Sequence, residues 1–103
     1  MAFTAITPAK LIAADLPTAS TVLYSAPAST RVMLKDIDIC NTTAASLYVT
    51  VLLGTKTLIP TVTVVRNGYY QWTGAQILNP GDTISAYASA AGAVIHASGG
   101  ECT

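Results

Sequence analysis

Short runs of strand-forming residues, separated by turn-forming residues, dominate the chain after residue 20. The clearest run spans residues 47–53, where Leu47, Val49, Val51 and Leu53 alternate with three other residues. A period of two marks a strand with one buried face. Turn signals follow one another at intervals of about 8–12 residues, which is typical of sandwiches and barrels. The sequence therefore predicts an all-β chain of seven or eight short strands.

Two pairs of neighbouring strands are expected to form hairpins. Asn67 and Gly68 lie between apolar runs, and Asn-Gly in that position is the strongest short signal for a β-hairpin. Nearer the end of the chain, residues 83–89 are expected to pair with residues 93–98 across the loop at 90–92.

Irregular strands are expected at two places. Between residues 31 and 40 the apolar side chains occupy first even and then odd positions (Val32, Leu34, Ile37, Ile39). A β-bulge near residues 35–36 would bring both sets onto one face. Pro60 interrupts another short strand and therefore predicts an edge of a sheet.

The first 17 residues differ from the rest of the chain. Residues 8–16 could form a short helix between two prolines, and an extended arm is an equal alternative. We therefore divide the chain into an N-terminal arm, 1–17, and a β-sandwich domain, 18–103. An apolar arm is expected to contact another subunit or protein, through the side chains of Phe3, Ile6, Leu11, Ile12 and Leu16.

The chain is short and carries little charge. Its 103 residues support one domain, which excludes a two-domain enzyme, and a 51% hydrophobic content excludes disorder. Five basic residues are scattered among five acidic ones, so a nucleic-acid partner is not expected. No signal peptide or membrane span is recognised. With only 10% charged residues, much of the surface must be neutral, which suits a subunit of an assembly.

Few residues are candidates for catalysis or metal binding. His96 stands alone, and a surface or interface role is favoured over that of a general base. Asp36 and Asp38 share one strand face and could hold a cation, but a solvent-facing strand that resists aggregation is favoured. Cys40 and Cys102 match no metal-binding spacing and are expected to be free thiols. We expect no catalytic residues, no metal and no cofactor.

Aromatic residues gather at residues 69–72. Strand alternation places Tyr70 and Trp72 on one face, where Trp72 is expected to anchor the core. Tyr69 and Tyr87 are left as candidate contact residues. The alternative is a carbohydrate-binding module, in which all four rings would form a stacking platform.

Several segments together resemble a group of small structural proteins of tailed bacteriophages. The resemblance covers the chain from about residue 10 onward and is carried by residues 21–27 (TVLYSAP), 31–42 (RVMLKDIDICNT), 77–84 (ILNPGDTI) and 98–101 (SGGE). It implies a jelly-roll-like β-sandwich without enzymatic activity, located in the virion after synthesis in the host cytoplasm.

The same resemblance implies partners and roles. Self-association is expected, with a trimer as the best guess, together with binding to the major capsid protein or another virion protein. The leading role is a capsid decoration or cement protein that stabilises the head lattice. The alternative is a subunit of the tail, collar or tail fibre. No nucleic acid or membrane partner is implied.

Overall fold

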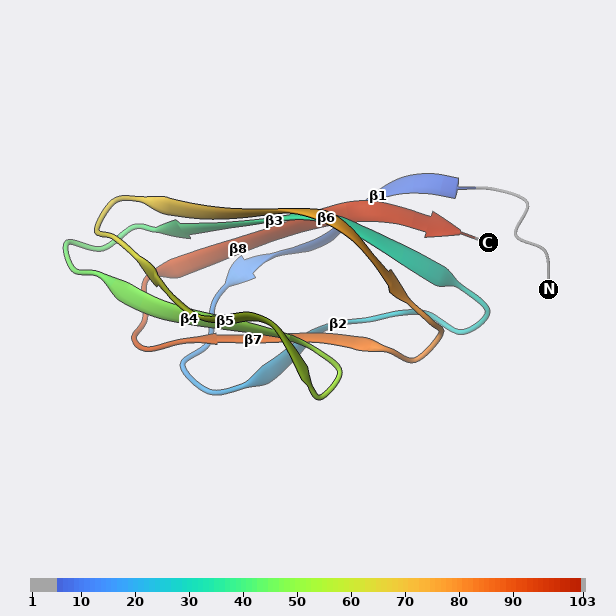
Figure 1. The fold of residues 1–103 in the computed structure, drawn as a ribbon, viewed down its shortest axis with the longest axis horizontal. Coiled ribbons are helices and arrows are strands. Elements are labelled where there is room, and N and C mark those ends of the chain that lie inside the picture. Colours follow the sequence, from blue (N-terminus) through green and yellow to red (C-terminus); the bar gives the residue numbers. More distant parts are fainter. Residues whose placement is uncertain (1–5, 103) are drawn as a thin grey trace.

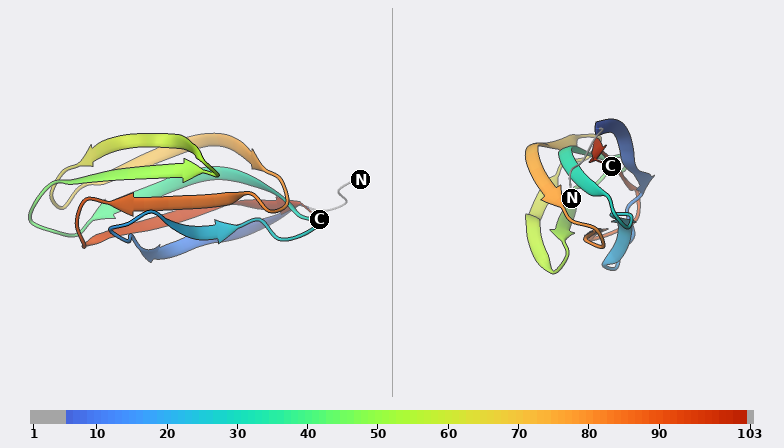
Figure 2. Two further views of the ribbon diagram at one scale, coloured as in Figure 1. Left: turned by 90° about the horizontal axis from the view of Figure 1, so that it is seen from below. Right: turned by 90° about the vertical axis from the view of Figure 1, so that its right-hand side faces the viewer.

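A computed structural model describes residues 6–102, and these residues form two antiparallel β-sheets of four strands each (Figure 1). The eight strands are β1 (Ile6–Asp15), β2 (Thr21–Ser25), β3 (Arg31–Asn41), β4 (Leu47–Leu53), β5 (Lys56–Val64), β6 (Tyr69–Leu78), β7 (Thr83–Ala88) and β8 (Ala93–Cys102). The two sheets pack face to face in an elongated sandwich of 48 × 22 × 18 Å (Figure 2). The predicted all-β sandwich is confirmed. Residues 6–102 contain no helix that is long and apolar enough to cross a membrane.

The strand order is that of a jelly roll. Sheet A has the order β1-β8-β3-β6, and sheet B has the order β2-β7-β4-β5. Except between β4 and β5, every connection carries the chain from one sheet to the other. This crossing joins the two sheets into one eight-stranded double Greek key.

The crossing connections correct both predicted hairpins. Asn67 and Gly68 do form a turn, in which the Gly68 N–H donates to the Val65 carbonyl oxygen at 2.9 Å and Asn67 has a φ of 52°. However, this turn leads from β5 in sheet B to β6 in sheet A, and the loop at 90–92 likewise joins different sheets. Local turn residues predict a reversal of the chain, but they do not determine which strand each neighbour pairs with. Among the eight strands of residues 6–102, β4 and β5 are the one consecutive pair that forms a hairpin, and it turns at Gly54, which has a φ of 63°.

The predicted irregularities are confirmed. The pairing of β3 with both of its neighbours shifts register between Leu34 and Asp36, which is the expected bulge. All four apolar side chains on either side of the bulge (Val32, Leu34, Ile37, Ile39) are consequently buried. Pro60 lies in β5, at an edge of sheet B.

The predicted N-terminal arm is wrong for the residues that the structure describes. Ile6–Asp15 is neither a helix nor a separate arm, but the edge strand β1, paired with β8 along its length. The sandwich therefore begins by Ile6 and not at residue 18. Leu11, Ile12 and Leu16 are buried in the chain's own core, so they are not exposed contact residues. Phe3 and the side chain of Ile6 lie outside the described part of the chain.

Strand β8 is longer than the sequence pattern predicts. It continues past Ser98 through Gly99 and Gly100 to Cys102, because glycines are compatible with its position at the centre of sheet A. An ideal Cβ at Gly99 would lie 1.9 Å from the Met33 carbonyl oxygen, on the strand that carries the bulge. The glycine thus allows two central strands to approach each other closely.

Candidate interaction surface

The outer face of sheet A brings together the polar residues that the sequence singles out. Because the bulge in β3 turns Ile37 and Ile39 inward, Asp36, Asp38 and Cys40 face outward. The registers then align residues of four strands in three rows: Lys10, Ser98, Asp36 and Thr73; Ala13, His96, Asp38 and Gln71; and Asp15, Val94, Cys40 and Tyr69. Charged residues occupy the side of this face nearer β1, whereas the β6 side is uncharged.

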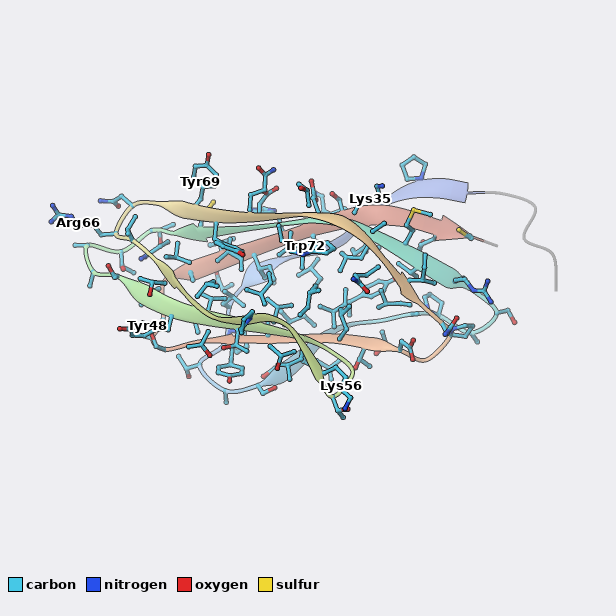
Figure 3. All side chains as sticks on the ribbon, viewed as in Figure 1. Lys35, Tyr48, Lys56, Arg66, Tyr69 and Trp72 are labelled. Atoms are coloured by element: carbon cyan, nitrogen blue, oxygen red, sulfur yellow. The ribbon has the colours of Figure 1, made fainter. Side chains whose placement is uncertain are left out.

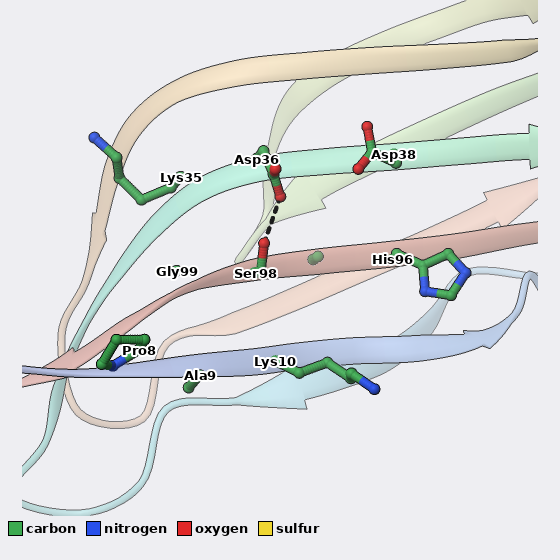
Figure 4. Close-up of a pocket in the computed structure, with 10 residues that line it drawn as sticks. Pro8, Ala9, Lys10, Lys35, Asp36, Asp38, His96, Ser98 and Gly99 are labelled. Atoms are coloured by element: carbon green, nitrogen blue, oxygen red, sulfur yellow. Dashed lines mark hydrogen bonds between the residues drawn. The ribbon is translucent and has the colours of Figure 1, made fainter.

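An open groove of about 570 Å³ lies on the charged side of this face (Figure 4). Four of the ten charged residues and the single histidine line it (Lys10, Lys35, Asp36, Asp38, His96). Its one hydrogen bond between lining side chains runs from the Ser98 hydroxyl to Asp36 Oδ1, at 2.6 Å. The groove therefore offers a mixed-charge surface to a partner.

Asp36 and Asp38 share one face, as predicted, and both are half-buried. Residue pairing places Asp38 next to His96 and Asp36 next to Ser98. Within residues 6–102, no group of three or more histidine, cysteine, aspartate or glutamate side chains is arranged to hold a metal ion.

Strand β6 supplies the uncharged side of the outer face. Seven of its ten residues are exposed, including Tyr69 at 72% and Ile77 at 51%. No charged residue occurs between Arg66 and Asp82. Tyr69 and Arg66 project outward from the end of the sandwich at which β6 begins, whereas Trp72 points between the sheets (Figure 3).

The aromatic residues do not form one platform. Tyr70 and Trp72 pack against the core from the inner face of β6, as the alternation predicts. Tyr69 lies on the outer face of sheet A, while the half-buried Tyr87 lies on the outer face of sheet B. The four rings proposed for sugar stacking therefore belong to three different surfaces.

The two cysteines lie at opposite ends of sheet A. Cys102 is paired with Arg31, at the start of β3, whereas Cys40 is near the end of the same strand. Nine residues of extended chain separate the two positions by roughly 30 Å. Both thiols are free and half-buried, and a disulfide between them within one chain is excluded, because it requires Cα atoms about 4.4–6.8 Å apart.

Two polar contacts were not anticipated from the sequence. The buried Asn41 amide donates to the carbonyl oxygens of Ala45 and Val64, at 2.8 and 2.9 Å, and its Oδ1 accepts from the backbone and hydroxyl of Thr43. Asn41-Thr42 at a strand end is typical of side-chain turn chemistry, a signal that could have identified this role.

The second contact joins the two sheets. The Tyr24 hydroxyl of β2 donates to Glu101 Oε2 of β8 at 2.7 Å. Burial raises the pKa of Tyr24 well above its ordinary range, and the hydrogen bond to the Glu101 carboxylate and its negative charge raise it further. The pair fixes the relative position of the sheets at one end of the sandwich.

Comparison with known proteins yields a likeness of fold. No family model and no curated protein matches the sequence. A chain from the solved structure of Bacillus endospore appendages, described as a novel family of disulfide-linked pili, aligns with 100% of this chain and 94% of its own length. The TM-score is 0.53 and the sequence identity is 14%, so the likeness is one of fold alone.

Proposed function

We propose that the protein is a structural subunit of a bacteriophage virion, without enzymatic activity, and that it acts as a decoration or cement protein on the head. The observation that carries this proposal is the long, exposed and uncharged surface of β6. Neutral surface that continues over a whole edge of a sheet suits burial against another protein.

The sequence resemblance supports the virion role, and the segments that carry it have structural explanations in the fold. In the segment 77–84, Gly81 has a φ of 90° and Asp82 accepts a hydrogen bond from the Asn79 N–H, which shapes the turn between β6 and β7. In the segment 98–101, Gly99 allows the close approach of β3, and Glu101 binds Tyr24. These residues specify the jelly-roll sandwich that the resemblance implies.

A shared fold with an appendage subunit is compatible with assembly from repeated copies, although 14% identity carries no function from that protein to this one. A tail, collar or tail-fibre subunit remains the alternative within the structural class. The carbohydrate-binding alternative depended on one platform of four aromatic rings, and the structure disperses these rings over three surfaces.

Quantitative mass spectrometry of particles purified from the virus that encodes this chain tests the proposal. We expect a copy number that scales with that of the major capsid protein. A copy number that matches the symmetry of the tail would replace the decoration role with the tail alternative. Absence from purified particles would overturn the virion role altogether. A glycan array provides the matched test of carbohydrate binding, and we expect no specific signal.

A further inference from the structure

Each sheet of the sandwich has two edge strands, and their protection differs. Natural sheets shield their edges from pairing with other chains by charges, prolines, bulges or short strands. β1 contains Pro8, Lys10 and a register shift, while β5 contains Lys56, Pro60 and register shifts against β4. β2 has five residues and a register shift.

β6 lacks these devices over its first half. It is ten residues long and contains no charged residue and no proline. Its one irregularity lies at Gly74 and Ala75, opposite the bulge in β3, which leaves residues 69–73 as an unbroken edge. Among the strands that the structure describes, this is the edge most open to pairing.

The hydrogen-bond pattern shows which backbone groups of β6 are directed away from the sheet. The Asn41 N–H donates to the Gly68 carbonyl oxygen at 2.9 Å, and this bond flanks Cys40 and Tyr69, which are therefore a non-hydrogen-bonded pair. In an antiparallel ladder such pairs alternate with hydrogen-bonded ones. The N–H and C=O groups of Tyr69, Gln71 and Thr73 consequently point to the open side of β6.

We propose that this edge pairs with the same edge of a second copy of the chain, in antiparallel orientation about a two-fold axis at Gln71. Gln71 then lies opposite its own copy, and Tyr69 lies opposite Thr73 of the other chain. In each opposing pair, the outward groups of both residues exchange N–H···O bonds. The inference rests on the proposed function, since it names the partner of the same neutral surface.

Charge favours a second copy over a different protein as the occupant. A two-fold axis places the residue on the axis opposite its own copy and brings its neighbours close to theirs, so a charged residue near the axis would approach an identical charge. Residues 67–81 contain none, as self-pairing requires. The pairing also places an aromatic ring opposite a β-branched residue, a favourable cross-strand pair, and allows the two Gln71 amides to hydrogen-bond.

The expected complex is a weak dimer in isolation. Stable interfaces typically bury about 1,600 Å², and five residues of strand bury less, so we expect a dissociation constant in the micromolar range. Repetition of the contact within a lattice would strengthen it by avidity. The two-fold pairing replaces the trimer that the resemblance suggests.

Sedimentation equilibrium of the full chain tests the pairing by a charge swap at the exposed Gln71. Gln71→Glu and Gln71→Lys each place like charges at the axis, and we expect each to weaken dimerisation at least about 10-fold. An equimolar mixture of the two variants should recover dimers at low salt. Thr63→Glu, at an exposed position of the protected edge strand β5, serves as the matched control and should dimerise like the unaltered chain. Unchanged circular dichroism and melting of each variant show that it is folded.

The pairing is overturned if the unaltered chain remains monomeric into the high micromolar range, or if it sediments as a trimer. Gln71 variants that dimerise normally, or a mixture that does not recover dimers, would overturn it equally. The virion role has a separate readout in purified particles. A chain that is present in particles but monomeric in solution refutes the pairing alone, whereas a dimer that is absent from particles refutes the virion role alone.

Discussion

The close approach of Gly99 to β3 predicts that replacing this glycine by alanine destabilises the fold strongly. In Gly99→Ala, the new Cβ would lie 1.9 Å from the Met33 carbonyl oxygen and 2.9 Å from its carbonyl carbon. Real Cβ atoms essentially never approach other atoms within 3.0 Å, so one backbone must move by about 1 Å. Both strands are held between neighbours in sheet A, with β8 between β1 and β3, and β3 between β8 and β6.

The loss of folding stability in Gly99→Ala comes from overpacking and not from backbone conformation, because the φ of Gly99 is not positive. Overpacking typically costs about 1–3 kcal/mol, and occasionally more. We expect about 3 kcal/mol here, since the obstacle is backbone and cannot rotate away. In a domain of this size each kcal/mol lowers the melting temperature by about 4–8 °C, so Gly99→Ala should lower it by roughly 12–24 °C.

Thermal and urea denaturation, followed by circular dichroism, measure the loss. Gly54→Ala is the matched control: no atom lies within 4 Å of its added Cβ, and its φ of 63° predicts a smaller cost of about 1–2 kcal/mol. If Gly99→Ala melts no lower than Gly54→Ala, β3 and β8 do not approach each other as described, and the structural reason for the glycine is refuted.

Three further predictions concern polar groups and thiols. Asn41→Asp should destabilise the fold by about 2–4 kcal/mol in urea denaturation, because it leaves two carbonyl oxygens, including that of Val64, without their donor and places a carboxylate beside them; an unchanged midpoint would contradict this. The raised pKa of Tyr24 means that the folded state resists loss of its proton, so its stabilising contribution is complete below the unfolded pKa of about 10 and is lost as the pH rises further. Melting temperatures between pH 8 and pH 11 should therefore fall less steeply for Tyr24→Phe than for the unaltered chain, and parallel curves would show that folding does not raise the pKa of Tyr24. Neither EDTA nor a reductant should shift the melting temperature of the isolated chain, since the two cysteines are too far apart to be joined within it; a drop of several degrees with either reagent would contradict the free-thiol and metal-free interpretation.

Local sequence patterns predicted features that depend on one strand. The change of phase around Lys35 was enough to place the bulge, because burial requires apolar residues on one face whatever the neighbouring strands are. Strand alternation likewise turned Trp72 toward the core, and the missing N–H of proline placed Pro60 at an edge. Such signals come from the side chains and backbone of one strand, so they can be recognised before its neighbours are known.

Pairing between strands could not be predicted in this way. The Asn67-Gly68 turn has the residues of a hairpin, yet its flanking strands belong to different sheets, since the pairing depends on the whole topology. The segment 8–16 was misassigned for a related reason. Its proline, alanines and lysine belong to residue types that are depleted in strands, and the strand forms because β8 offers it a partner about 80 residues away.

The candidate surface was predicted only in part. Low charge indicated a neutral face, and Tyr69 proved to lie on it, but the open edge of β6 becomes visible only when its position in sheet A is known. Leu11, Ile12 and Leu16 were assigned to an interface because apolar residues that bind a partner and apolar residues that fill a core have the same composition.

The central position of β8 determines how the protein can fold as it is synthesised. β8 lies between β1 and β3 (Figure 1), so sheet A lacks a middle strand until the ribosome has made the last described strand. At about 5–20 residues per second, translation from Asp15 to its partner Val94 takes roughly 4–16 s. Throughout that interval β1 has no partner strand. Its backbone can then pair with other nascent chains, and its apolar side chains are exposed to them. The nascent chain is therefore most vulnerable to aggregation before β8 has been synthesised.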